Sequence, residues 1–181
     1  MSSVDSLAFR KCLGKFSTGV TVVTSRDGDR IHGMTVNSFT SVSLVPPLVL
    51  FCPKNGTRTL DLMRNSHVYA VNILSGDQAW ISERFAGMST EDDDRFAGIE
   101  YTDGPLTGCP LIDGCLAHLE CRMVDHHKAG DHNICVAEVI GLAQHPEADL
   151  APLLYHAGNY HVFPDRILKR PIAVPAPRKD F

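Results

Sequence analysis

The sequence predicts a mainly β protein in which antiparallel strands form a closed or split barrel. Short β-branched and apolar segments recur along most of the chain, each bounded by Gly, Pro, Asn or Asp. Two longer segments with alternating apolar residues flank a polar turn, which is typical of an antiparallel hairpin. Only a few helical patterns interrupt the strands, and there is no internal repeat or domain linker. Roughly six to eight antiparallel strands with few helices indicate a barrel.

A helix is expected first, capped by Asp5 or Ser6 and followed by a hairpin. Residues 19–24, GVTVVT, are β-branched, and RDGD at residues 26–29 is a hairpin turn signal. The helix carries an apolar stripe at helical spacing, made of Phe9, Leu13 and Phe16 together with Cys12.

Residues 32–51, HGMTVNSFTSVSLVPPLVLF, are expected to form the next two strands. The apolar positions change parity at Phe39 and again at Val42, which predicts bulges or a bend. The Pro-Pro pair belongs at a strand start or at an edge, and LVLFC at residues 48–52 is predicted to be a fully buried strand. The stretch is also rich in neutral hydrogen-bonding side chains, namely Thr35, Asn37, Ser38, Thr40, Ser41 and Ser43.

The middle of the chain alternates between helix and strand. Residues 53–65 are predicted to be a loop leading into a helix, residues 67–74 a strand and residues 76–87 a helical stretch. MSTEDDDRF at residues 88–96 is acidic and is expected to be a solvated surface segment.

A long hairpin with a polar tip is expected next. The strand before the tip has one apolar face, made of Cys115, Ala117, Leu119, Cys121 and Met123. HHKAGDH at residues 126–132 is expected to break this strand, and NICVAEVIGL at residues 133–142 to form its partner. Residues 152–163 are expected to form a final pair of short strands around a Gly turn. We assign residues 1–165 to one barrel domain and residues 166–181 to a Pro-rich extended arm.

The composition excludes several classes of function. The chain of 181 residues is 44% hydrophobic and 21% charged, as in a soluble globular protein, and its net charge is −4. Without a Lys/Arg cluster we expect no binding to nucleic acid or to a membrane surface. No apolar segment is long enough to span a bilayer and no signal peptide is visible, so a cytoplasmic location is expected. The six cysteines include no CxxC pair and are expected to be reduced thiols.

Common nucleotide-binding and hydrolase motifs are absent from the sequence. It contains no GxGxxG, no GxxxxGK[ST] and no GxSxG. The best metal candidate is DHHKAGDH at residues 125–132, but its spacing matches no familiar ligand set. We therefore expect no metal site and interpret this segment as a polar loop that binds another ligand or none.

The loop CPKNGTRTLDL, which begins at Cys52, is a candidate phosphate site. Asn55 or Thr57 can cap the helix that follows. Free backbone N–H groups at a helix start bind phosphate, aided by nearby hydroxyls and cations. The side chains of this kind are Thr57, Thr59, Lys54 and Arg58. An ordinary capped surface helix could carry the same residues, so the loop alone leaves both interpretations open.

Together with the polar strand, this loop suits a flavin. The edge of the isoalloxazine ring needs several neutral hydrogen bonds, and the flavin phosphate needs an anion site. A strand that faces water would also be polar, and a histidine beside a Gly-Asp tip, as in AGDHNI, is usual turn chemistry. The functional alternative is that His132 contacts a second substrate lying on the flavin.

Six segments, taken together, resemble one family. They follow in order between about residues 9 and 163 and read GMTVNSFTSVSLVPPLVLF, VNIL, DDRF, GCPLIDGCLAHLEC, AGDHNICVAEV and PLLYHAGNY. They resemble the flavin-reductase-like, FMN-binding split-barrel proteins, and more narrowly the reductase components of two-component flavin-dependent monooxygenases. The resemblance implies a homodimeric Greek-key split barrel that uses NADH or NADPH to reduce FMN or FAD for a separate oxygenase.

The resemblance also implies which residues bind the flavin. Residues 35–38 would line the isoalloxazine ring, while residues 52–54 and 57–59 would hold the ribityl phosphate. The full set is Met34, Thr35, Val36, Asn37, Ser38, Ser41, Cys52, Pro53, Lys54, Thr57, Arg58, Thr59 and Phe85. Gly56 stands where family members often have a small hydroxyl residue, so backbone N–H groups would carry more of the phosphate binding.

The nicotinamide site implied by the resemblance consists of His132 and Tyr160. Stacking of the two rings at about 3 to 3.5 Å would supply most of the catalysis, with no general acid or base for the hydride. We expect His132 to position the dinucleotide. The hydroxyl and amide groups are expected to stabilise the negative charge on the reduced isoalloxazine ring. Two alternatives remain: a non-catalytic flavin- or haem-binding barrel, and an enzyme like pyridoxamine phosphate oxidase, which would need a basic pocket for its substrate phosphate.

Overall fold

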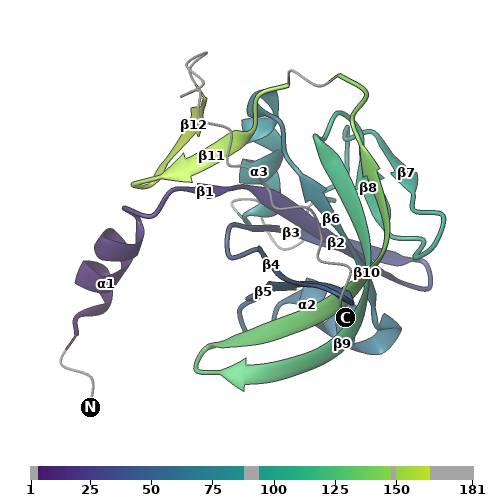
Figure 1. The fold of residues 1–181 in the computed structure, drawn as a ribbon, viewed down its shortest axis with the longest axis horizontal. Coiled ribbons are helices and arrows are strands. Elements are labelled where there is room, and N and C mark those ends of the chain that lie inside the picture. Colours follow the sequence, from purple (N-terminus) through teal and green to yellow (C-terminus); the bar gives the residue numbers. More distant parts are fainter. Residues whose placement is uncertain (1–3, 88–93, 148–149, 164–181) are drawn as a thin grey trace, which may run out of the picture.

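Seven antiparallel strands form the main sheet of the computed structural model (Figure 1), which describes residues 4–87, 94–147 and 150–163. The strands are β2 (Thr21–Asp27), β3 (Arg30–Val36), β4 (Thr40–Leu44), β5 (Pro47–Phe51), β6 (Val68–Ile73), β9 (Ala117–Ala129) and β10 (His132–Gln144). Their order across the sheet is β3-β2-β6-β9-β10-β5-β4, so β3 and β4 are its edges. The predicted mainly β, antiparallel architecture is confirmed.

The sheet curls around a first hydrophobic core. Val36 from the edge strand β3 and Val49 from β5, near the opposite edge, belong to the same buried cluster. Helix α2 (Arg58–Ser66) adds Leu60 and Met63 to this cluster. Because both ends of the sheet share one core while β3 and β4 are not paired with each other among the described strands, the sheet is a split barrel.

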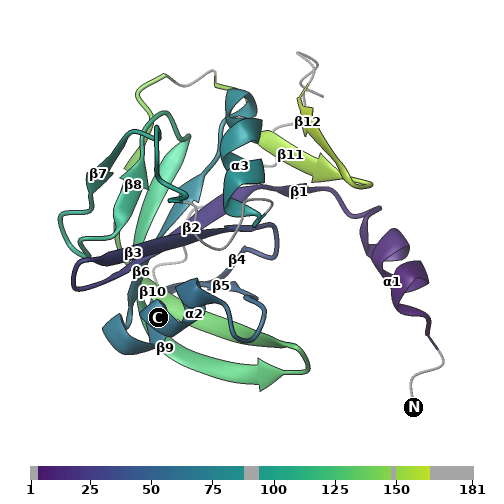
Figure 2. The ribbon, with the colours of Figure 1, turned by 180° about the vertical axis from the view of Figure 1, so that it is seen from behind.

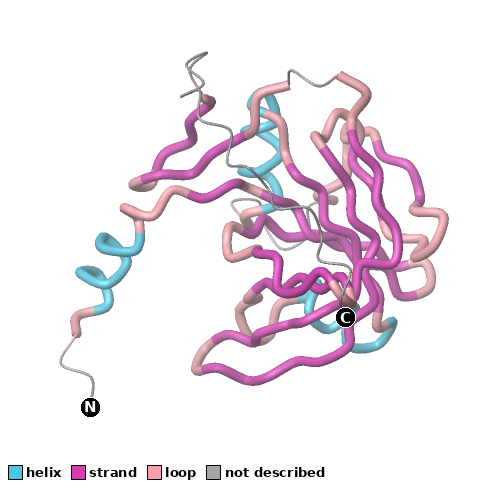
Figure 3. Tube along the Cα trace, in the orientation of Figure 1, coloured by secondary structure: helices cyan, strands magenta, loops and turns pink. Residues whose placement is uncertain are grey.

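A second hydrophobic core lies beside the barrel. The elements around it are β1 (Thr18–Gly19), η1 (Gly76–Gln78), α3 (Ala79–Phe85), β7 (Tyr101–Asp103), β8 (Pro110–Ile112), β11 (Leu153–His156) and β12 (Asn159–Val162). Strands β1, β11 and β12 form a small antiparallel sheet, and β7 pairs with β8. Val22, Phe85, Phe96 and Leu153 are buried in this core. Figure 3 shows helices α1, α2 and α3 at separate places around the strands.

The hairpins predicted from turn residues are confirmed. β2 and β3 meet at Gly28, whose φ of 61° lies in the left-handed region that glycine favours. β11 and β12 pair around Ala157 and Gly158. The first change of parity is the break between β3 and β4, and the second is a register shift between Ser41 and Ser43 against β5.

The prediction of a fully buried strand at residues 48–52 is wrong. In β5, Val49 and Phe51 are buried, whereas Leu48 and Leu50 are partly exposed. The two sets alternate because only one face of the strand contacts the barrel core. The apolar outer face of β5 is only partly covered by the described chain.

The polar segment at residues 126–132 does not break its strand. β9 runs to Ala129 and β10 starts at His132, so that only residues 130–131 form the tip. Figure 1 shows the end of this hairpin extending beyond the barrel, and residues 124–131 are exposed. Because the side chains on both faces of this segment are polar, the sequence shows no alternation of polar and apolar residues there. The backbone pairing nevertheless continues.

Helix α1 (Ser6–Leu13) forms as expected, with Asp5 Oδ2 accepting a hydrogen bond from the Ala8 N–H at 2.8 Å. Figures 1 and 2, which are opposite views, both show this helix standing away from the sheet. No residue of the helix is buried. Its apolar stripe is therefore outside both cores.

Two expectations concern segments that the structure describes only in part or not at all. Residues 88–93 of the acidic segment and the proposed arm at residues 166–181 lie outside the described residues. None of the helices in the described ranges is long and apolar enough to cross a membrane.

Candidate functional site

A cavity of about 940 Å³ lies between helix α1, the β11–β12 turn and the barrel. Four of the predicted site residues line it together: Thr35 on β3, Asn37 just after β3, His132 at the start of β10 and Tyr160 on β12. These residues are up to 125 positions apart in sequence, from Thr35 to Tyr160. Their convergence makes this cavity the candidate ring-binding site, which we call the ring cavity.

The wall of the ring cavity is a short chain of hydroxyl groups. The Tyr160 hydroxyl lies 2.8 Å from Ser82 Oγ on α3, and Thr35 Oγ1 donates to the Ser82 carbonyl at 2.6 Å. Thr35 faces this wall because alternation along β3 directs its neighbours Met34 and Val36 toward the first core. The side chains of Met34 and Val36 therefore pack in the barrel and do not line the ring cavity.

The predicted phosphate loop is attached to the hairpin tip that carries His132. Lys54 and His132 form an isolated antiparallel bridge, and the Asn55 N–H donates to the Asp131 carbonyl at 2.9 Å. His132 Nδ1 lies 2.8 Å from Asp131 Oδ1. This contact with His132 lowers the pKa of the Asp131 carboxyl. The loop and the histidine are thus held as one unit.

Ser38 ties the polar segment after β3 to the end of β5. The Cys52 N–H donates to Ser38 Oγ at 3.0 Å. Burial raises the pKa of the Cys52 thiol, which keeps it neutral. Ser41 is exposed on the edge strand β4, and Pro53 is buried beneath the loop.

The start of helix α2 keeps its N–H groups free of a side-chain cap. Thr57 is the N-cap residue, but its hydroxyl donates to the Lys54 carbonyl at 3.2 Å and accepts no helix N–H. Thr59 is fully buried, with Oγ1 2.8 Å from His32 Nδ1. An ordinary capped helix would have used the Thr57 oxygen, so this start retains the donors that an anion would need.

His32 and Arg95 are two residues near this helix start that the sequence did not single out. Burial, together with the charges of Arg95 and Arg58, lowers the pKa of His32 to about 4. Arg95 Nη1 donates to the carbonyls of Gly33 at 3.0 Å and Phe85 at 3.1 Å. Arg95 lies in the DDRF segment, but nothing in that segment indicates which distant strand it would contact.

Phe85 lies behind the ring cavity. Its side chain is 1% exposed and packs in the second core, where its ring is 5.0 Å from that of Phe96 with the planes at 74°. A Cβ on Gly33 would lie 2.7 Å from the Phe85 ring. Phe85 therefore supports the strand that carries Thr35 and does not itself line the cavity.

The ring cavity also contains residues that the sequence did not indicate. Ser82 and Tyr155 contribute polar and aromatic groups, and Lys11 and Lys15 bring cations from the N-terminal segment. Within the described ranges, no three His, Cys, Asp or Glu side chains gather into a possible metal site. A polar wall, aromatic rings and cations suit a planar ligand that carries phosphate.

Comparison with known proteins agrees with this geometry. A family model described as flavin reductase like domain matches residues 13–164. The reductase subunit HsaB of a flavin-dependent monooxygenase from Rhodococcus jostii is 38% identical, over 98% of this chain and 86% of its own length. The FMN reductase (NADH) SmoA of Agrobacterium fabrum is 42% identical over 88% of this chain and 87% of its own length.

A solved structure extends the likeness to three dimensions. The NADH:FAD oxidoreductase SgcE6 of Streptomyces globisporus C-1027, in complex with NAD and FAD fragments, superposes with a TM-score of 0.82. It is 36% identical to this chain and covers 91% of it and 98% of its own chain. The fold and the cavity define a split-barrel flavoprotein. The chain belongs to the flavin-reductase-like family.

Proposed function

We propose that this chain is an NADH-dependent flavin reductase that supplies reduced FAD or FMN to a separate monooxygenase. The observation that carries the proposal is the ring cavity, where Thr35 and Asn37 lie with His132 and Tyr160. Its relatives act on both flavins by their names, so both remain substrates in the proposal. The HsaB relative is a monooxygenase subunit, which supports an oxygenase as the partner.

The residues of the ring cavity fit a flavin and a nicotinamide. A volume of about 940 Å³ is at the upper end of ordinary ligand sites, enough for two stacked rings. Neutral hydroxyl and amide groups from Thr35, Asn37 and Ser82 would bind the polar edge of an isoalloxazine ring. The uncapped start of α2, with Arg58 and Lys54 near it, would bind the ribityl phosphate.

The side chains orient the reactants and exclude water. Bound flavin and reduced nicotinamide together supply the redox chemistry, which no side chain of the chain provides. His132, fixed by Asp131, would hold the nicotinamide dinucleotide against the polar wall. Tyr160, fixed through Ser82, would close the side of the cavity nearest β12. Holding two reactants in one orientation is the main source of rate enhancement here.

We also propose that the working form is a homodimer. The turn between β4 and β5 exposes Leu44 by 89% and Val45 by 88%. Further exposed apolar side chains lie on the N-terminal segment and on β4, namely Leu7, Phe9, Leu13, Phe16 and Val42. Strongly exposed apolar side chains of this kind are typical of an interface, and a second copy would cover them. The six unpaired cysteines support a reducing cytoplasmic location.

Steady-state kinetics with both flavins and both nicotinamides test the proposed function. The purified chain should consume NADH, followed by its near-ultraviolet absorbance, at a rate that saturates with FAD or FMN. Turnover that does not exceed the background of flavin and NADH alone would contradict the proposal. Adding cytochrome c as an acceptor distinguishes released reduced flavin from flavin that stays bound.

A further inference from the structure

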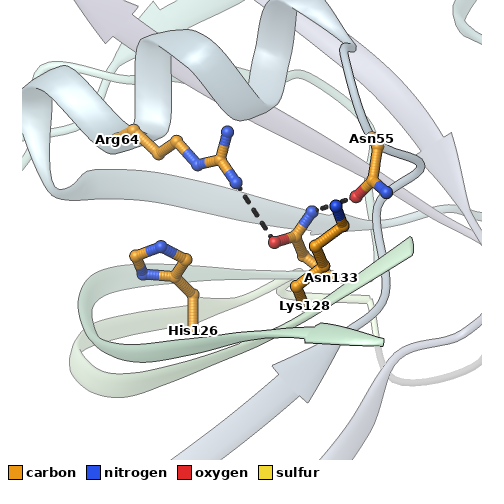
Figure 4. Close-up of a pocket in the computed structure, with 5 residues that line it drawn as sticks. All are labelled: Asn55, Arg64, His126, Lys128 and Asn133. Carbon is orange, nitrogen blue, oxygen red and sulfur yellow. Dashed lines mark hydrogen bonds between the residues drawn. The ribbon is translucent and has the colours of Figure 1, made fainter. Parts of the chain in front are cut away.

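A second cavity, of about 310 Å³, lies between helix α2 and the β9–β10 hairpin (Figure 4). We call it the distal pocket, and it is lined by Asn55, Arg64, His126, Lys128 and Asn133. Arg64 comes from α2, Asn55 from the loop after β5 and the other three from the hairpin. None of the five lining residues is acidic, although the chain as a whole is.

The floor of the distal pocket is a fixed network of amides. Asn133 is 2% exposed, and its Oδ1 accepts a hydrogen bond from Arg64 Nη2 at 3.1 Å. Asn133 Nδ2 donates to Asn55 Oδ1, and Asn55 Nδ2 donates to the Gly130 carbonyl at 3.1 Å. Figure 4 shows Arg64 reaching from the helix toward this pair of amides. The buried Asn133 and its hydrogen-bonded neighbour Asn55 therefore hold the Arg64 guanidinium in place.

Two further nitrogen-bearing side chains, those of Lys128 and His126, stand at the pocket. Among the described residues, neither the Lys128 amine nor the His126 ring has a hydrogen-bonding or ionic partner. Arg64 has a carboxylate only at 4.0 Å, from Asp61. His127, on the opposite face of β9, is by contrast 2.9 Å from Asp125. Alternation along β9 therefore places the Lys128 amine and the His126 ring together on the pocket side.

The distal pocket lies across the start of β10 from the ring cavity. His132 lines the ring cavity, and its neighbour Asn133 lines the distal pocket. Adjacent residues of a strand point to opposite faces, so the same short segment separates the two sites. The predicted phosphate loop joins this segment, because the Asn133 N–H donates to the Pro53 carbonyl at 2.9 Å. A ligand that begins in the ring cavity and continues past this loop would reach the distal pocket.

We propose that the distal pocket binds a phosphate on the adenosine half of a dinucleotide. An Arg fork with a Lys and a His around a small cavity matches the geometry and charge of a phosphate group. The inference rests on the proposed function, which places dinucleotides in the adjacent cavity. Three sources share this chemistry: the diphosphate of FAD, the diphosphate of the nicotinamide dinucleotide and the 2′-phosphate of NADPH. Occupancy of the pocket would make the enzyme prefer FAD to FMN in the first case or NADPH to NADH in the third, and would strengthen binding of both nicotinamides in the second.

Kinetics of two variants and a matched control test the proposal. Lys128→Ala and His126→Ala each remove an exposed nitrogen-bearing side chain without touching the amide floor, and His127→Ala removes the neighbouring ring on the opposite face. The KM values of FAD, FMN, NADH and NADPH are measured for each variant. A rise of about tenfold for FAD alone identifies the FAD diphosphate, and a similar rise for NADPH alone identifies the 2′-phosphate. A rise for NADH and NADPH together identifies the nicotinamide diphosphate. Unchanged KM values for all four ligands in both pocket variants overturn the proposal.

A binding measurement separates this proposal from the proposed function. ADP is titrated into flavin-free protein by calorimetry, with 2′-AMP as the second probe. Binding that is lost in Lys128→Ala but kept in His127→Ala supports the distal pocket even where no flavin is reduced. Absence of binding by both probes to the wild-type chain overturns it even where flavin reduction is fast. Thermal melting of each variant confirms that the fold is retained.

Discussion

The imidazole of His132 and the carboxylate of Asp131 are hydrogen-bonded across 2.8 Å at the tip of the β9–β10 hairpin. The bond engages Nδ1, so Nε2 is the ring nitrogen left to contact a ligand. The backbone of the same two residues bonds to Lys54 and Asn55 in the predicted phosphate loop. One short segment thus connects the two halves of the candidate site.

We expect His132→Ala to raise the KM for NADH several-fold while flavin affinity is nearly unchanged. The side chain faces the ring cavity from the hairpin and holds none of the groups around Thr35. KM values from steady-state kinetics and flavin affinity from fluorescence quenching measure the two effects separately. His161→Ala on β12, outside the cavity lining, should change neither value. Loss of flavin affinity in His132→Ala would show that the assignment of His132 to the nicotinamide is wrong.

Gly33→Ala should destabilise the fold because the new methyl group has no room. Its Cβ would lie 2.7 and 2.8 Å from two atoms of the buried Phe85 ring. Overpacking of this kind costs about 1 to 3 kcal/mol of unfolding free energy. Gly19→Ala is the matched control, because nothing lies within 4 Å of its Cβ position. Chemical denaturation of the two variants compares them, and equal stability would contradict the close packing of Phe85 on β3.

The pH dependence of stability should carry a contribution from His32. Its pKa is lowered to about 4 in the folded chain by burial and by Arg95 and Arg58, against about 6.5 in an unfolded chain. Between these two pH values the unfolded chain binds the proton and the folded chain does not, so stability falls as the pH falls.

Replacing His32 should therefore flatten the acid limb of the stability profile. The ring is only half-buried, so solvent screening keeps the effect to about 1 to 2 kcal/mol. Urea unfolding of the wild type and of His32→Gln at pH values on both sides of this window measures it, with His161→Gln as the control. An identical slope in the wild type and His32→Gln would refute the proton linkage at His32.

The proposed homodimer should dissociate when a charge is placed on the β4–β5 turn. The molecular mass measured in solution should then fall. Leu44→Glu would place a carboxylate in the proposed interface, where its desolvation is unfavourable. Leu106→Glu alters an apolar side chain that is also exposed, by 57%, but on the β7–β8 loop. Sedimentation equilibrium should give a dimer for the wild type and Leu106→Glu and a monomer for Leu44→Glu. A monomeric wild-type protein would contradict the proposed homodimer.

Local pattern predicted the strands and hairpins because turn residues and alternation act over short distances. Gly28 and the Ala157–Gly158 turn illustrate this, since each one fixes the pairing of the two strands beside it. The polar residues at the end of β3 and just after it likewise predicted a binding surface with Thr35 and Asn37, and both residues line the ring cavity. Periodicity could not show whether a face is covered, and the outer face of β5 is therefore more exposed than expected.

The sequence pattern could not predict contacts between residues that are far apart in the sequence. His32 meets Thr59 from another element, and Arg95 bonds to the backbone of Gly33. Glu120 alternates with the apolar residues Leu119 and Cys121, yet it is 5% exposed, and its carboxylate accepts hydrogen bonds from the backbone of residues 106 and 107. The distal pocket depends on three such long-range hydrogen bonds, those of Arg64 with Asn133, Asn133 with Asn55 and Asn55 with Gly130. No local sequence motif indicates the pocket.

Anaerobic reduction of flavin tests the central claim most directly. The protein is mixed with NADH and FAD, and separately with NADH and FMN, in the absence of oxygen, and the visible absorbance of oxidised flavin is followed. We predict that this absorbance disappears much faster than without protein, in step with an equal amount of NADH. We also predict that His132→Ala needs more NADH to reach the same rate. Loss of flavin absorbance at the protein-free rate with both flavins would contradict the assignment of this chain as a flavin reductase.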